Sequence, residues 1–129
     1  GFMVWGPFED TTNFVVLRAA FADLFPDEVH DFETPFRLGA PGALETLFAE
    51  AEFAEVEERE LRFTPEIPAK IKFWRPAVDM TLGTRLEGEP ESVRAALEDR
   101  ITARLEPYRA GDVYRLTAHI RLAVGRHAD

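Results

Sequence analysis

The chain has 129 residues and a mass of 14.6 kDa, the length of one ordinary domain. Hydrophobic residues make up 46% of it, which excludes disordered and low-complexity classes. The 15 basic and 24 acidic residues give a net charge of −9, so we expect no binding to nucleic acid or to membranes. The chain contains no cysteine, which excludes disulfides and thiolate metal sites.

The first third of the chain predicts one strand and two helices. The apolar residues from Gly1 to Trp5 indicate the end of a strand that is entered from its middle, or else an edge strand. Apolar spacing of three and four predicts helices over 13–25 and 41–51. The acidic segment between them contains His30. We interpret it as a solvated loop rather than a metal site.

The stretch from Phe53 to Phe63 predicts a strand with uneven alternation. The change of phase indicates either a β-bulge or a strand that is covered on both faces. Four acidic residues recur along this stretch: Glu55, Glu57, Glu58 and Glu60. They could supply paired carboxylates for catalysis, but the favoured interpretation is a solvated face of the strand.

The remainder of the chain predicts helical and extended segments in turn. A short helical run over 71–80, interrupted by Pro76, precedes a loop over 81–89 and a long helix over 90–108. The clearest strand runs from Tyr114 to Val124, with apolar and polar residues in strict alternation. His119 lies on its polar side, where a structural role is favoured over a catalytic one.

Known catalytic and nucleotide-binding motifs are absent from the sequence. It contains no Walker sequence, GxGxxG, HExxH or GxSxG. The order of the elements predicts an acidic α/β protein with a single domain over 1–129. Residue patterns alone therefore indicate a fold class but no reaction.

Several short stretches, in order along nearly the whole chain, resemble the C-terminal half of class I S-adenosylmethionine-dependent methyltransferases. The similarity is to the ubiquinone/menaquinone-type and other small-molecule members. It rests on Val4-Trp5-Gly6-Pro7, Asn13-Phe14, Pro35-Phe36-Arg37-Leu38-Gly39, Leu47-Phe48-Ala49-Glu50-Ala51-Glu52-Phe53, Phe73-Trp74-Arg75 and Leu122-Ala123-Val124-Gly125-Arg126.

The resemblance implies a partial Rossmann-like sheet made of the family's last three strands, with a helical substrate cap around 67–108. In the family the final strand runs antiparallel between the other two. That places the strand ending at Val124 between the strands at Phe2–Trp5 and Ala54–Phe63. Glu52 stands where the family has glycine, at a helix end that favours a left-handed backbone.

The resemblance also implies a function on the substrate side of the enzyme. The family's glycine-rich turn and acidic ribose ligand would both precede Gly1, so S-adenosylmethionine is expected for the full enzyme but not for this chain alone. The chain is then inactive by itself, and no metal is implied. Aromatic residues and one arginine are candidates to bind a small-molecule acceptor, although aromatics at such spacings are more often core: Trp5, Phe36, Phe73, Trp74, Arg75 and Tyr108.

Alternative interpretations are a non-catalytic small-molecule-binding module and a dimeric interaction module. A half sheet would leave the strand at Phe2–Trp5 with an open edge, which favours a homodimer with the N-terminal residues in or near its interface. The absence of cysteine and of a signal-peptide pattern favours a cytoplasmic location. The acceptor and the methylated atom are not indicated.

Overall fold

The computed structural model describes residues 1–127 and shows a mixed α/β protein with two small antiparallel sheets. The chain divides into two compact units. Unit 1 comprises residues 1–11, 33–64 and the segment from 117 onward, and unit 2 comprises residues 12–32 and 65–116. Neither unit is continuous in sequence, so each depends on segments that lie far apart along the chain.

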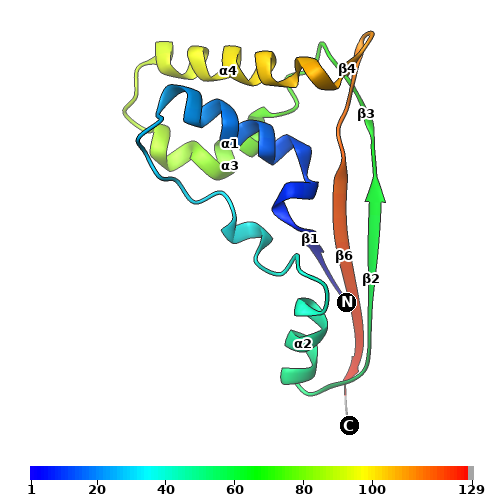
Figure 1. Cartoon of the computed structure of the whole chain (residues 1–129). Coiled ribbons are helices and arrows are strands. Elements are labelled where there is room, and N and C mark those ends of the chain that lie inside the picture. The colour runs from blue at the N-terminus through cyan, green and yellow to red at the C-terminus, as the bar shows by residue number, and fades with distance from the viewer. Residues whose placement is uncertain (128–129) are drawn as a thin grey trace. The chain divides into compact units, whose positions relative to one another are not determined.

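Unit 1 is built on a three-stranded sheet with the order β1-β6-β2 (Figure 1). The strands are β1 (Phe2–Trp5), β2 (Phe53–Phe63) and β6 (Ala118–His127). Both β1 and β2 run antiparallel to β6, with Trp5 and Leu61 on either side of Ile120. The predicted central and antiparallel position of the last strand is confirmed.

One helix, α2 (Ala43–Glu50), covers part of this sheet. Its buried Leu44 and Phe48 pack against Ala123 of β6. Phe48 lies directly over Gly125, where a Cβ atom would stand 2.9 Å from the phenylalanine ring. Two short 3-10 turns complete the unit, η1 (Phe8–Asp10) and η2 (Thr34–Phe36).

Two residues with left-handed backbone lie where α2 leads into β2, one in the connection and one inside the strand. Glu52 has φ of 64°, as its position in the motif predicts, and Glu55 has φ of 52°. The register of β2 against β6 shifts between Ala54 and Glu57, which agrees with the bulge, one of the two explanations that the sequence offered for the uneven alternation. A non-glycine residue in this conformation is disfavoured by about 1–2 kcal/mol.

Unit 2 contains three α-helices and a second small sheet. The helices are α1 (Thr12–Leu24), α3 (Arg75–Leu86) and α4 (Glu91–Leu105), followed by the turn η3 (Glu106–Tyr108). The sheet has the order β3 (Glu66–Pro68), β5 (Val113–Arg115) and β4 (Arg109–Ala110). The most deeply buried side chains of the unit come mainly from the helices: Leu17, Leu82, Leu86, Leu97, Ile101 and Leu105.

The predicted helical run over 71–80 and the loop over 81–89 are wrong in their bounds. The helix α3 begins at Arg75 and continues to Leu86. Pro76 does not interrupt it, because it occupies the first turn, where the missing N–H has no intrahelical partner to lose.

The single strand predicted from Tyr114 to Val124 is wrong, because the structure divides it. Tyr114 belongs to β5 and pairs with Ile67 and Arg109 in unit 2, whereas β6 begins at Ala118 in unit 1. The alternation of side chains continues through the break, so the residue pattern gives no sign of it. Within residues 1–127, no helix combines the length and apolar character that crossing a lipid bilayer requires.

Candidate functional site

The first candidate site lies at the end of β1 in unit 1. Trp5 is 37% exposed and lines a cavity of about 380 Å³ together with Met3, Val4, Pro35 and Ile120. The buried Phe36 lies beside Trp5, with ring centroids 6.1 Å apart. Of the predicted substrate-binding residues, Trp5 therefore lines an apolar cavity, and Phe36 packs against Trp5 without being one of the lining residues.

A buried histidine lies close to this end of the sheet, on the opposite face. His119 is 1% exposed, and both of its ring nitrogens meet a carboxylate. Its Nδ1 lies 2.9 Å from Asp10 Oδ2 and its Nε2 lies 3.0 Å from Glu60 Oε2. Each ring nitrogen of His119 therefore has a carboxylate oxygen within hydrogen-bond distance.

Two glycines make room for this histidine. A Cβ atom on Gly6 would stand 2.4 Å from His119 Cγ, and a Cβ atom on Gly39 would stand 2.4 Å from the Gly6 carbonyl oxygen. The Gly6 N–H donates to the His119 carbonyl oxygen at 2.7 Å. Backbone and ring are thus packed so closely that any side chain at Gly6 displaces His119.

An ion pair extends the same cluster along the sheet. The Arg121 Nε donates to Glu58 at 2.8 Å and its Nη1 donates to Glu60 at 3.1 Å. The side chains of Arg121 and Glu58 are 9% and 5% exposed. Glu58 also accepts the N–H of Gly42, the residue before α2, at 3.2 Å. We call these five side chains the sheet cluster: Asp10, Glu58, Glu60, His119 and Arg121.

The other predicted binding residues belong to unit 2. Phe73 makes an edge contact with Trp74, with centroids 5.4 Å apart, and also contacts Tyr114. Trp74 is 4% exposed, and its buried Nε1 has no hydrogen-bond partner among the described residues. Tyr108 lies in η3 and is 38% exposed. Trp74 is a core aromatic of this unit, and the partly buried Phe73 packs beside it.

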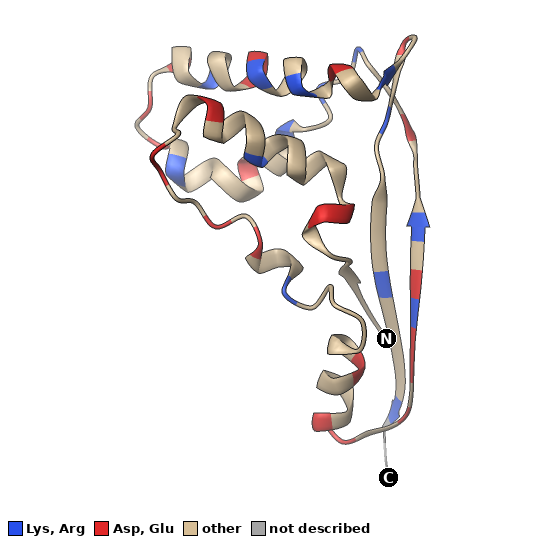
Figure 2. Ribbon diagram, in the orientation of Figure 1, with Lys and Arg blue, Asp and Glu red and all other residues tan. Residues whose placement is uncertain are grey.

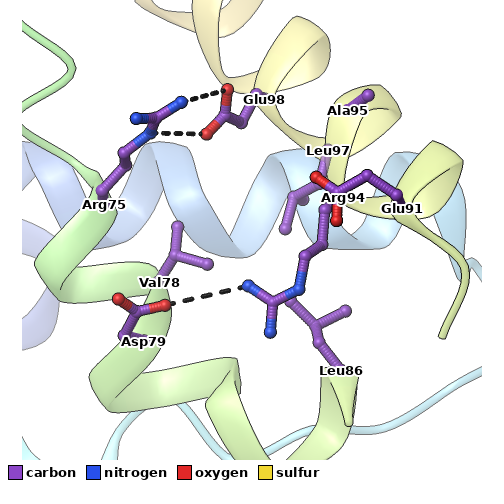
Figure 3. A pocket seen from close by; sticks show the side chains of 9 residues that line it. All are labelled: Arg75, Val78, Asp79, Leu86, Glu91, Arg94, Ala95, Leu97 and Glu98. Atoms are coloured by element: carbon purple, nitrogen blue, oxygen red, sulfur yellow. Dashed lines mark hydrogen bonds and ion pairs between the residues drawn. The ribbon is translucent and has the colours of Figure 1, made fainter. Parts of the chain in front are cut away.

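A second cavity, of about 460 Å³, lies between α3 and α4 in unit 2 (Figure 3). Arg75 donates to Glu98 at 2.8 Å across one end, and Arg94 lies 3.8 Å from Asp79 at the other. The hydrogen bond with Glu98 raises the pKa of Arg75, and the same contact lowers the pKa of Glu98. Apolar side chains complete the lining, among them Val78, Leu86 and Leu97.

The predicted site residues therefore fall into two groups. Trp5 and Phe36 lie together in unit 1, whereas Phe73, Trp74, Arg75 and Tyr108 lie in unit 2. Of the last four, Arg75 alone is among the residues that line the cavity between α3 and α4. Within residues 1–127 no group of three or more His, Asp or Glu side chains is arranged to hold a metal ion.

The sheet cluster is the part of the site that sequence reasoning missed. The alternation of β6 correctly placed His119 and Arg121 on one face, but their carboxylate partners are distant in sequence. Asp10 precedes His119 by 109 residues, and Glu60 precedes it by 59. The glutamates at 58 and 60, interpreted from the sequence as solvated, hold these two side chains.

A comparison of the chain with models of known protein families found no match, and a comparison with curated proteins found none either. The function of the chain is therefore inferred from its own sequence and geometry.

Proposed function

We propose that the chain is the substrate-side region of an S-adenosylmethionine-dependent methyltransferase that acts on a small molecule. The observation that carries this proposal is the strand order β1-β6-β2, with the last strand of the chain antiparallel between the other two. The methyltransferase resemblance predicts this order in advance, and residue periodicity alone does not. The same proposal includes a partial Rossmann-like sheet as the fold and the cytoplasm as the location of the protein.

The proposed acceptor site is the cavity beside Trp5. In α/β sheets ligands bind beyond the carboxyl ends of the parallel strands, and β1 ends at Trp5. The cavity is of a size that suits a small molecule, and the indole offers an aromatic surface beside it. Methyl transfer to an acceptor that is already nucleophilic depends more on alignment and on exclusion of water than on acid–base chemistry. An apolar cavity can supply both of these conditions.

The chain alone does not offer a cradle for the methyl donor. Its only closely spaced glycines, Gly39 and Gly42, have their N–H groups engaged, with Phe36 and Glu58 respectively. Neither is available to hold a cofactor as a glycine-rich turn does. The residues present therefore do not fit S-adenosylmethionine, and a complete enzyme would take its cofactor-binding half from elsewhere.

Titration of the chain with hydroxylated naphthalenes and benzenes tests the acceptor site. In a Trp74→Phe variant the fluorescence of Trp5 reports on the cavity, and we expect saturable quenching. A Trp5→Phe variant, which keeps Trp74, serves as the matched control and should show none. Calorimetry with S-adenosylmethionine should give no heat of binding.

Two results would refute the proposal. Quenching that is the same in both variants would mean that the cavity beside Trp5 does not bind acceptors. Micromolar binding of S-adenosylmethionine by this chain would mean that it is not a substrate-side region that lacks the cofactor site.

A further inference from the structure

In the β1-β6-β2 sheet the face that carries polar side chains is buried and the apolar face is exposed, which is the reverse of what polarity predicts. Side chains alternate between the faces along β6. His119, Arg121 and Ala123 point to one face and are 1%, 8% and 1% exposed. On the other face, Leu122 and Val124 are 37% and 61% exposed. The polar side chains are buried, and the apolar ones meet solvent.

Neighbouring strands extend the exposed side into a continuous apolar surface. In the register of the sheet, Met3 lies beside Leu122, and Leu61 lies beside Ile120. Met3, Leu61 and Phe63 are 64%, 49% and 43% exposed. We define the apolar face by the following residues, with Trp5 at its margin on the edge strand: Met3, Leu61, Phe63, Ile120, Leu122 and Val124.

Charge on this side of the sheet is confined to the border and is internally paired. Arg59 lies beside Leu122 and Glu57 beside Val124, and the Arg59 Nε donates to Glu57 at 2.8 Å. A second pair, Arg126 with Glu55 at 3.3 Å, lies at the far end of β6 and the start of β2. On the opposite face, the sheet cluster holds the ion pairs of His119 and Arg121. In Figure 2 charged segments follow one another along β2, whereas the β6 ribbon is largely uncharged.

The apolar face is as large as the largest apolar patch that a typical monomer exposes. Its side chains present on the order of 500 Å², and patches of about this size are often sites of interaction. Two such faces packed together would bury on the order of 1,000 Å², the size at which specific interfaces begin.

We propose that two copies of the chain pack face to face through the apolar face. A second copy suits this surface because the centre of its own apolar face is also uncharged. Contact through other surfaces of two copies is opposed by the net charge of −9 that each copy carries. The border of the apolar face is also self-complementary, because a two-fold arrangement can bring Arg59 of one copy to Glu57 of the other. Sheets commonly pack in this way, about 10 Å apart.

This arrangement goes beyond the proposed function and does not depend on it. It also differs from pairing through the backbone edge of β1, which the half-sheet pattern of the sequence favours, since the contact here is made by side chains of β6 and β2. Met3 and Ile120 also line the cavity beside Trp5, so the interface borders the proposed acceptor site. Leu122 and Val124 do not line that cavity, so the sedimentation of a variant at these two positions and the quenching of Trp5 by acceptors are separate results.

Sedimentation velocity at about 100 µM tests the proposal, because association is concentration-dependent. We expect the parent chain to sediment as a dimer, with twice the chain mass of 14.6 kDa. The Leu122→Glu/Val124→Glu variant should sediment as a monomer. The control is Ile71→Glu/Met80→Glu, which places the same charges on side chains 50% and 60% exposed in unit 2 and should remain dimeric. Circular dichroism verifies that each variant is folded.

A second measurement avoids introducing charge. The chain has no cysteine, so Val124→Cys and Met80→Cys each provide one thiol. We expect the thiol at 124 to react with a maleimide much more slowly at high protein concentration than after dilution, whereas the thiol at 80 reacts equally at both. A monomeric parent, a dimer that survives the double glutamate, large polydisperse aggregates, or equal reactivity at 124 would overturn the proposal.

Discussion

The sheet cluster of unit 1 and the ion pairs between α1 and α4 of unit 2 contain similar groups in different surroundings. In the sheet cluster, Arg121 and Glu58 are less than a tenth exposed. Between the helices, Arg100 and Arg104 both bind Asp23 but are 45% and 43% exposed. A buried charge that loses its partner cannot be solvated, whereas an exposed one returns to water. Similar hydrogen-bond distances therefore correspond to different contributions to stability.

The largest effect that this comparison predicts is for Arg121→Met. The substitution leaves the Glu58 carboxylate buried without its guanidinium, so we expect a loss of about 3–5 kcal/mol in the free energy of unfolding. Arg100→Met, the matched change on the helix surface, should cost less than about 1 kcal/mol. Urea denaturation of both variants measures the difference. Equal midpoints would show that burial does not separate the two clusters.

A smaller effect is expected at Gly6, which adjoins the sheet cluster. The added methyl group of Gly6→Ala would force His119 away from Asp10 and Glu60, and overpacking of this kind costs about 1–3 kcal/mol. At Gly83, inside α3, a Cβ atom meets nothing within 4 Å. The Gly83→Ala control should therefore stabilise the chain by about 0.5–1 kcal/mol. Melting temperatures that shift in the same direction would contradict the packing around His119.

The smallest expected effect concerns the exposed ion pairs of Asp23 with Arg100 and Arg104, and it is a dependence of stability on pH. Hydrogen bonds from Arg104 and then Arg100 hold the pKa of Asp23 at about 2, below its ordinary value of 3.8. Because the pKa is lower in the folded state, the carboxylate stabilises the fold above about pH 4. That contribution is lost as the pH falls toward 2.

Melting temperatures between pH 5 and pH 2 test this effect. We expect Asp23→Asn to show a shallower decline than the parent in that window, and Asp27→Asn, an exposed change nearby, to follow the parent. Identical curves for the parent and Asp23→Asn would mean that solvent screening removes the effect.

The sequence predicts those parts of the fold that depend on local or motif-based signals. The bounds of β2, its bulge and the left-handed Glu52 follow from residues that are close along the chain. The position of β6 between β1 and β2 came from the methyltransferase resemblance. The end of α3 was missed, because a proline in the first turn of a helix and a proline that breaks one look the same in a short window.

The alternation of β6 shows the limit of such reasoning most clearly. The alternation predicts that Leu122 and Arg121 point to opposite faces of the sheet. Because apolar side chains are usually buried, it also predicts that Leu122 points to the interior. The structure covers the other face, where α2 packs on Ala123 and the η1 turn brings Asp10 to His119. Tertiary neighbours that are distant in sequence decide which side of a strand is the interior. The sheet cluster therefore could not be predicted from the strand itself.

The outer edge of β2 has a consequence for how copies of this chain can add to one another. Within residues 1–127, β2 pairs with β6 alone, which leaves its other edge free. Acidic and basic side chains follow one another along this edge strand, and a bulge interrupts its start. Stacking identical strands about 4.8 Å apart would set each glutamate against its own copy. The strand is thus protected against fibril growth by repulsion along the same segment that holds Arg121 and His119 in place.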